Sequence, residues 1–160
     1  MKQLQLIIPI LFLSLFCSAQ VVVQVYDADT YKVYHNGKFE KIRLANVDAP
    51  GLNQYYGNLA KQAVSKLILE KEVVVHAYSK DWYGRSIAVV SVGGLRLDSL
   101  LLIDGLAWHS SYYSYNHSLS EFEEKARANK FGMWRCDHNV PPWIWQRLKK
   151  KEKRLREMCR

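Results

Sequence analysis

The sequence predicts an α+β fold, in which a closed or partly closed β-barrel of five strands carries about three packed helices. Two observations lead to this prediction. Short segments rich in β-branched residues, separated by turn residues, occupy much of the first half, and segments with apolar residues at helical spacing lie between and after them. A chain of 160 residues is long enough for one such domain with a real core.

The first three predicted strands form an antiparallel meander. Residues 21–25 are rich in β-branched side chains and predict one strand, and residues 30–34 predict the next. Asn36-Gly37 is a strong signal for a tight turn between paired strands. Apolar residues then recur as far as Val47, which predicts a third strand with a bulge.

A helix and two more strands follow the meander. Pro50-Gly51 breaks the strand pattern and begins a loop. Between residues 59 and 68, apolar side chains recur three and four positions apart, which is one face of a helix. Residues 73–78 and 86–92 then predict the last two strands.

Helices dominate the remainder of the chain. Residues 97–103 predict a short helix. Ser118 is followed three residues later by Glu121, the pattern of a capping box, and predicts the start of a helix that runs to about Asn129. Pro141-Pro142 marks the predicted end of the compact part.

The chain divides into three predicted parts. Residues 1–19 combine a short basic start, an apolar stretch and small final residues, which indicates a secretory signal peptide. Residues 20–146 form the predicted domain, and residues 147–160 a basic helical tail. The apolar stretch is too short to favour a membrane span. We therefore expect a secreted or periplasmic monomer without a membrane segment after signal cleavage. A lipid anchor on Cys17 is the alternative, and the bulky Phe16 before it argues against that.

Two cysteines remain after the predicted signal is removed. Cys136 and Cys159 can pair in an oxidising compartment, which would pin the tail to the domain. Two unpaired thiols are the alternative.

The net charge of +8 is concentrated in the tail. Residues 147–160 hold eight Lys/Arg and two Glu, a net of +6. A basic tail can bind polyanions through counterion release. It can equally be a solvated helix end that keeps the protein soluble. We favour the second role and expect weak, non-specific polyanion binding beside it.

Charged residues in three short stretches have the chemistry of a phosphodiester site. Asp29 and Asp48 are hard oxygen ligands of the kind that hold a divalent cation, and Asp27 is close enough in sequence for an outer role. Arg43 and Arg85 carry planar, permanently charged forks that match phosphate oxygens. Each residue alone also fits a loop or a surface ion pair, so their combination and order carry the hypothesis.

In this combination the chain resembles the thermonucleases, the staphylococcal-nuclease-like family. The resemblance covers roughly residues 21–146. The matching segments are Val25-Tyr26-Asp27-Ala28-Asp29-Thr30, Ile42-Arg43-Leu44, Val47-Asp48-Ala49-Pro50, Gln54 with Gly57, Asp81-Trp82-Tyr83-Gly84-Arg85, Gly105-Leu106-Ala107-Trp108, Ala126-Arg127, Gly132-Met133-Trp134 and the closing Pro141-Pro142-Trp143.

The resemblance implies a five-stranded OB-like barrel with three helices and a calcium-dependent nuclease that acts on DNA and RNA, preferably single-stranded. It places the calcium carboxylates on Asp29 and Asp48, and a backbone carbonyl ligand on Ala49. It places the two catalytic, phosphate-binding arginines on Arg43 and Arg85.

Aromatic residues complete the implied site. Tyr83 matches a nucleotide-contacting tyrosine by its motif, while Tyr113 and Tyr115 are candidates by position only. Three tryptophans look like packing residues under the tail, with a stacking platform for bases as the alternative; they are Trp134, Trp143 and Trp145.

Gly51 is the departure from the family pattern. The resemblance implies a glutamate here that positions or deprotonates the attacking water, and glycine cannot do so. Asp81 and Glu40 are remote candidates for a substitute base. General-base assistance contributes about 10²–10⁴ in rate. We therefore expect a weakened nuclease, with a non-catalytic nucleic-acid-binding module on the same barrel as the alternative.

Overall fold

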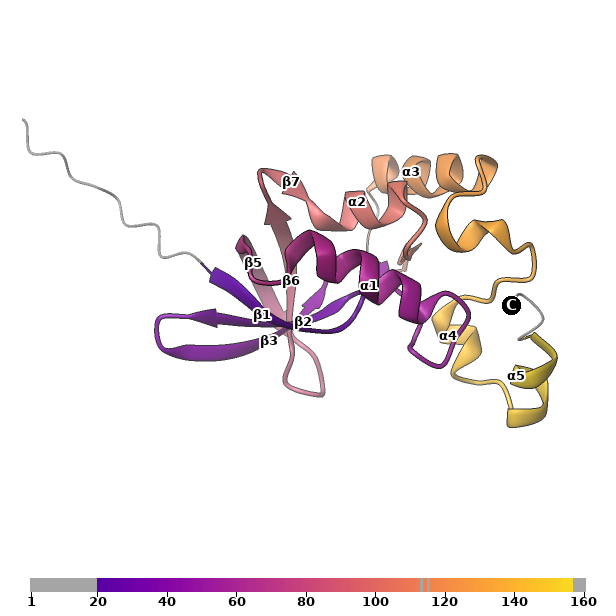
Figure 1. Cartoon of the computed structure of the whole chain (residues 1–160), viewed down its shortest axis with the longest axis horizontal. Coiled ribbons are helices and arrows are strands. Elements are labelled where there is room, and N and C mark those ends of the chain that lie inside the picture. Colours follow the sequence, from indigo (N-terminus) through magenta and orange to yellow (C-terminus); the bar gives the residue numbers. More distant parts are fainter. Residues whose placement is uncertain (1–19, 113, 115, 157–160) are drawn as a thin grey trace, which may run out of the picture.

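Five strands form a closed barrel in the computed structural model, which describes residues 20–112, 114 and 116–156. The strands pair in the order β3-β2-β1-β5-β6, and each neighbouring pair is antiparallel. A parallel pairing of β3 with β6 closes the barrel (Figure 1). The predicted barrel is thus confirmed. Its strands are β1 Gln20–Asp27, β2 Thr30–His35, β3 Lys38–Leu44, β5 Glu72–Lys80 and β6 Ser86–Val92.

The three predicted helices are present. They are α1 Gly57–Ile68, α2 Leu97–Ile103 and α3 His117–Ala128. α1 and α2 pack on the barrel strands, and α3 packs mainly on α2. The apolar stripe of α1 and most of the apolar residues of α2 join the alternating inward residues of the strands in one core. Burying these side chains removes apolar area from water, which is the main force that holds the helices on the barrel. Fully buried members include Val22, Ile42, Val64, Ile68 and Leu101.

The third strand ends earlier than its apolar pattern predicts. β3 stops at Leu44, and Asn46 adopts a left-handed backbone with φ 67° while its side chain donates to Asp98 at 2.8 Å. The chain therefore leaves the barrel, and Val47 lies in a separate strand, β4 Val47–Asp48. β4 pairs with β8 Trp108–His109 in a second, two-stranded sheet. The prediction of one bulged strand through Val47 is wrong for this reason. A two-residue strand after the Gly93-Gly94 turn, β7 Leu95–Arg96, is too short to predict from sequence.

The N-cap of α3 is not the predicted one. The helix begins at His117, and the Asn116 side chain accepts a hydrogen bond from the Ser118 amide at 3.1 Å. Ser118 therefore lies inside the first turn. The Glu121 carboxylate lies 3.5 Å from Nδ1 of His117 instead of completing a capping box.

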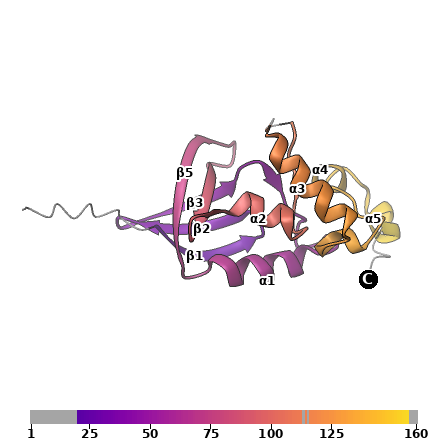
Figure 2. The same cartoon turned by 90° about the horizontal axis from the view of Figure 1, so that it is seen from above.

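The C-terminal elements lie at the opposite end of the molecule from the barrel, as both views show (Figures 1 and 2). They are the 3₁₀ turn η1 Gly132–Arg135, α4 Pro142–Trp145 and α5 Lys150–Arg156. Trp134 and Trp145 are buried, as predicted for packing residues. Trp143 is 41% exposed, so the prediction that it packs under the tail is wrong. Its neighbours Pro142 and Trp145 take the inward positions of α4.

Several predictions concern residues that the structure does not describe. The predicted signal peptide, Tyr113, Tyr115 and Cys159 lie outside the described residues. Cys136 is disulfide-bonded. Among the described helices, none is long and apolar enough to cross a membrane.

Candidate active site

Strand pairing brings the predicted acidic and basic residues to one rim of the barrel. Thr30 at the start of β2 lies opposite Arg43 at the end of β3 in the sheet register. The Leu44 amide also donates to the Asp29 carbonyl at 2.8 Å, which ties the β1–β2 turn to the end of β3. Since β4 follows only two residues after β3, Asp48 returns to the same place.

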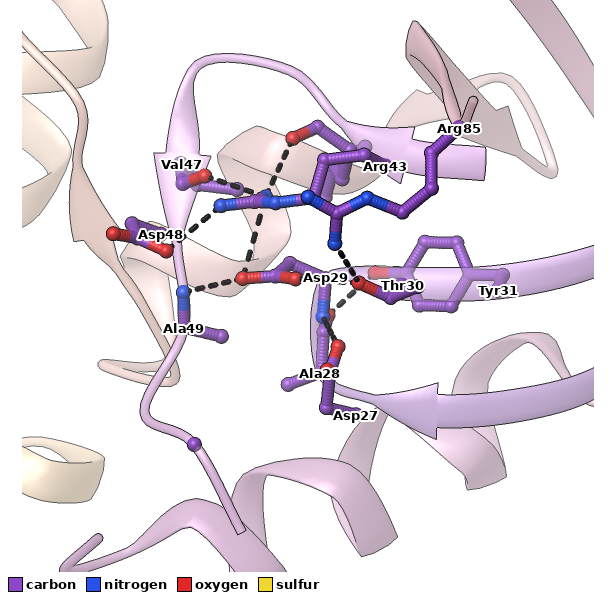
Figure 3. Close-up of polar contacts among 12 residues, drawn as sticks. Asp27, Ala28, Asp29, Thr30, Tyr31, Arg43, Val47, Asp48, Ala49 and Arg85 are labelled. Carbon is purple, nitrogen blue, oxygen red and sulfur yellow. Dashed lines mark hydrogen bonds and ion pairs between the residues drawn. The ribbon is translucent and has the colours of Figure 1, made fainter. Parts of the chain in front are cut away.

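Arg43 lies at the centre of this cluster, between the two aspartates (Figure 3). Its Nη2 donates to Asp48 Oδ1 at 2.7 Å, and its Nη1 lies 3.3 Å from Asp29 Oδ2. Nη1 also donates to the carbonyls of Leu44 at 2.8 Å and Val47 at 2.9 Å. Three of the five N–H donors are thus used to hold the guanidinium. Among the described residues, none accepts a hydrogen bond from Nε–H or from the second Nη2–H.

Asp29 is a buried carboxylate in a crowded acidic position. It is 5% exposed, and burial raises its pKa to about 7 against the opposing effect of Arg43. Asp27 and Asp48 raise this pKa further. Asp29 Oδ2 accepts from the Ala49 amide at 2.7 Å and Oδ1 from the Thr30 hydroxyl at 3.0 Å. The negative charge here exceeds what Arg43 compensates, so an added cation would stabilise the ionised form.

The oxygen atoms at this rim fit a hard divalent cation. Asp48 is partly buried, and burial raises its pKa while Arg43 lowers it. No group of three or more His, Cys, Asp or Glu side chains able to hold a metal occurs within the described ranges. Any metal bound by Asp29 and Asp48 would therefore draw on backbone carbonyls, such as that of Ala49, and on water. Calcium accepts such a mixed oxygen shell.

Arg85 enters the cluster from the other side, on a tight turn between β5 and β6 (Figure 3). Asp81 Oδ1 accepts from the backbone amides of Tyr83 at 2.9 Å and Arg85 at 3.0 Å, while Gly84 supplies a positive φ of 76°. The Arg85 Nε donates to Asp81 Oδ2 at 2.6 Å, and its Nη1 donates to the Thr30 hydroxyl at 3.4 Å. The turn therefore aims the guanidinium at Thr30, beside Asp29.

The two remote candidates for a substitute base are both engaged elsewhere. Burial opposes ionisation of Asp81, but the hydrogen bonds from Arg85 and Tyr83 prevail and lower its pKa, which weakens it as a base. Glu40 accepts a hydrogen bond from the buried Ser86 hydroxyl. The geometry thus assigns structural contacts to both.

A groove of about 480 Å³ runs beside the two arginines. Arg43, Asp48, Arg85 and Tyr78 all border it. Tyr78 is 65% exposed on β5 and escapes sequence-based prediction, because nothing in its local sequence distinguishes it from other strand tyrosines. Thr30 contacts both Asp29 and Arg85, although its sequence signal is only that of a motif position beside Asp29.

Tyr83 is 85% exposed, and the centroid of its ring lies 5.4 Å from the Arg85 guanidinium carbon. It therefore flanks the site without packing into it. The structure places Arg43, Arg85, Asp29, Asp48 and Ala49 together. Tyr113 and Tyr115 lie beyond the described residues.

Gly51 begins a compact turn against the first residue of α1. The Gln54 amide donates to the Gly51 carbonyl at 2.8 Å. A Cβ on Gly57 would lie 2.0 Å from the Gly51 carbonyl oxygen, so only glycine fits at position 57 without a backbone shift. A Cβ on Gly51 itself meets only the Asn53 side chain, at 3.3 Å, and Gly51 has no positive φ. The backbone at position 51 can therefore carry a side chain.

The chain is similar in sequence to known and uncharacterized nucleases. Residues 41–136 match the family model described as staphylococcal nuclease homologue. The chain is 35% identical to an uncharacterized endonuclease of Escherichia coli O157:H7 over 129 residues, which covers 80% of this chain and 84% of that protein. It is 32% identical to a micrococcal nuclease of Shigella flexneri, over 81% of this chain and 80% of that one. It is also 37% identical to an uncharacterized 38.1 kDa protein of Capnoides sempervirens, over 71% of this chain, and spans only 33% of that relative's length.

Proposed function

Because the chain belongs to the staphylococcal nuclease family, we propose that it hydrolyses phosphodiester bonds of DNA and RNA, with calcium held by Asp29, Asp48 and the Ala49 carbonyl. The observation that carries the proposal is the convergence of Arg43 and Arg85 on the buried Asp29–Thr30 pair (Figure 3). Two permanently charged forks beside a cation-binding carboxylate form an environment suited to a phosphodiester anion.

Apart from the metal, Arg43 and Arg85 are the groups that can stabilise the transition state. Charge accumulates on the phosphate oxygens in the transition state, and donors that are already oriented lower the barrier without further reorganisation. The carbonyls of Leu44 and Val47 hold the Arg43 guanidinium in place before substrate arrives. A bound divalent cation would supply Lewis-acid neutralisation of the phosphate charge.

Gly51 supports a reduced rate. The attacking water has no carboxylate at position 51 to orient it, and Asp81 and Glu40 are committed to Arg85 and Ser86. Charge stabilisation alone still accelerates the reaction, so we infer a weak, metal-dependent nuclease. The same observation favours the second candidate function, a module that binds nucleic acid without cutting it.

The proposed site of action is outside the cytoplasm. The N-terminal segment 1–19 supports export, with the domain at residues 20–146 and the basic tail at residues 147–160 acting in a secreted or periplasmic protein. The disulfide at Cys136 is consistent with an oxidising compartment.

The central experiment compares the mature protein with two variants on single-stranded DNA in calcium and in chelator. We expect slow, chelator-sensitive cleavage by the parent, and loss of it in Arg43→Ala. Gly51→Glu should raise the rate by about 10²–10⁴, because the backbone there accepts a side chain and the variant restores a base.

Arg135→Ala is the matched control, since Arg135 is an exposed arginine on η1, away from the cluster. Cleavage that appears only in Gly51→Glu would show that the parent has an intact metal and phosphate site but lacks a general base. That result would favour the binding module. Absence of both cleavage and binding in all proteins would contradict both functions.

A further inference from the structure

A second groove continues directly from the candidate active site. It has a volume of about 580 Å³ and shares Asp48 and Ser110 with the groove beside the two arginines. We call it the C-terminal groove, because Trp143 and Arg147 line it together with Ser111 and Tyr112. A polymer bound at the arginines can therefore extend into it along one continuous surface.

The local structure of the C-terminal segment turns Trp143 toward this groove. Pro142 and Trp145 lie three positions apart and are both buried, so the opposite face of α4 is left exposed. Trp143 lies on that face and is 41% exposed, and Arg147 follows it four residues later. The segment is anchored to the loop between β4 and α1, because the Gln54 side-chain amide donates to the carbonyl of the buried Val140.

Arg147 is available for an anionic ligand. Arg43, Arg85 and Arg127 each pair with a carboxylate. Within the part of the chain that the structure describes, no carboxylate pairs with Arg147, and its side chain is exposed. Lysines at residues 149–151 extend the same positive charge beyond it.

We propose that the C-terminal groove is a nucleotide-binding subsite, in which a base stacks on Trp143 and Arg147 binds a phosphate one or more nucleotides away from the scissile bond. The proposal rests on the proposed function and adds residues to it. An exposed indole beside a free guanidinium is the combination that binds an unstacked base and its phosphate. Bases in a duplex already stack on each other, so this subsite selects single strands. Tyr112 lines the same groove, which therefore has two aromatic residues on its surface.

The test measures binding of fluorescently labelled oligothymidylates of two, four and eight nucleotides in calcium. Gel analysis checks that each oligonucleotide stays intact, and KM replaces Kd for any that is cut. The parent should bind the octamer much more tightly than the dimer. Trp143→Ala should weaken octamer binding about tenfold or more and leave dimer binding unchanged. Trp143→Phe should retain most of the affinity, since a phenyl ring still stacks.

Charge is tested separately through salt dependence. Arg147→Gln should lower the slope of log affinity against log salt by about 0.7 for the octamer, the value for one phosphate contact on a single strand. Ile144→Ala is the control for Trp143, because Ile144 is 43% exposed on the same helix and borders neither groove. Arg135→Gln is the control for Arg147, since its side chain is also exposed.

The outcomes separate the two proposals. Octamer binding that Trp143→Ala and Ile144→Ala weaken equally, or that Arg147→Gln and Arg135→Gln weaken equally, overturns the subsite and leaves the proposed function standing. An octamer that binds no better than the dimer has the same consequence. Failure of the parent to bind or cut any oligonucleotide overturns the proposed function itself. Thermal unfolding of each variant excludes misfolding as the cause, and Trp143→Phe and Arg147→Gln keep the test decisive if Trp143→Ala is unstable.

Discussion

Asp29, at the barrel rim, is an unfavourable place for a negative charge in the absence of a bound cation. Its carboxyl group is buried beside Arg43 and is close to two further carboxylates, those of Asp27 and Asp48. Burying an ionised carboxylate costs free energy, and that cost appears as its pKa of about 7. A bound cation would favour the same ionised form that burial disfavours, which is why the proposed calcium would stabilise the site.

Asp29 leads to a prediction about stability and pH in the metal-free protein. Its pKa is about 7 when folded, against 3.8 for a fully solvated aspartate, so the folded state binds more protons between these values. The free energy of unfolding should therefore fall as pH rises from about 4 to about 7, by up to about 4 kcal/mol. Urea unfolding in chelator at several pH values measures this.

Asp29→Asn isolates the contribution of Asp29, because its unfolding free energy should fall less over this range. The raised pKa of Asp48 contributes a decline of the same sign in both proteins. Burial lowers the pKa of His109, whose contribution has the opposite sign and is lost as pH falls, but it is common to both proteins. Calcium should restore stability to the parent at pH 7 and not to the variant. A parent and variant with parallel pH profiles would contradict the assignment.

At the scale of elements, short-range hydrogen bonds decide where helices and strands begin and end. Asn46 leaves the barrel in a left-handed conformation and anchors to Asp98, a fully buried carboxylate that also pairs with Arg96. The pKa of Asp98 is lowered, because hydrogen bonds from Arg96 and Asn46 prevail over its burial. This contact sets the start of β4 and so the position of Asp48.

The α3 cap gives an element-scale prediction. Asn116→Ala should destabilise the protein by about 1 kcal/mol, because it removes the side chain that accepts from the Ser118 amide. Ser118→Ala should change the unfolding free energy by much less, since Ser118 is not the cap. Denaturant unfolding of the two variants measures the difference. A larger loss for Ser118→Ala would show that the capping box predicted from sequence is the correct one.

At the scale of the whole molecule, the C-terminal elements extend the barrel domain. Trp145 and Val140 are buried, and the Lys153 ammonium lies 5.4 Å from the centroid of a Trp145 ring. A second cluster joins Trp108, Ala126, Met133 and Trp134, and ties α3 and η1 to the small second sheet. The segment that follows the barrel is therefore packed against the rest of the chain.

The disulfide at Cys136 should stabilise the whole domain. Cys136 is disulfide-bonded, and Cys159 is the partner that the sequence offers once the predicted signal peptide is removed; this pairing would close the tail onto the domain. Cys136→Ser should cost about 2–4 kcal/mol of stability, through the greater freedom of the unfolded chain. Peptide mapping without reductant should recover Cys136 and Cys159 in one linked pair. Equal melting temperatures with and without reductant, or a different linked pair, would contradict this prediction.

Short local sequence patterns were enough to predict most of the strands and helices. Strand alternation, the Asn36-Gly37 turn and the helical spacing after Gly57 reflect local sterics and one-sided burial, which neighbouring residues specify on their own. The separate β4–β8 sheet escaped prediction because its partners, Val47 and His109, are far apart in the chain. Pairing over that distance depends on the completed barrel.

The sequence by itself determined which residues carry the candidate chemistry, because aspartate, arginine and the glycine at position 51 have fixed chemical capacities. Only the tertiary structure decided how deeply these side chains are buried, which groups they contact and where they point. Closure of β3 on β6 buried Asp29, held Arg43 between two carboxylates and turned Arg85 toward Thr30. Folding also left Trp143 partly exposed and brought Arg147 to a groove that shares Asp48 with the site. The physical reason is that pKa, burial and proximity arise from groups distant in sequence, whose arrangement exists only in the folded chain.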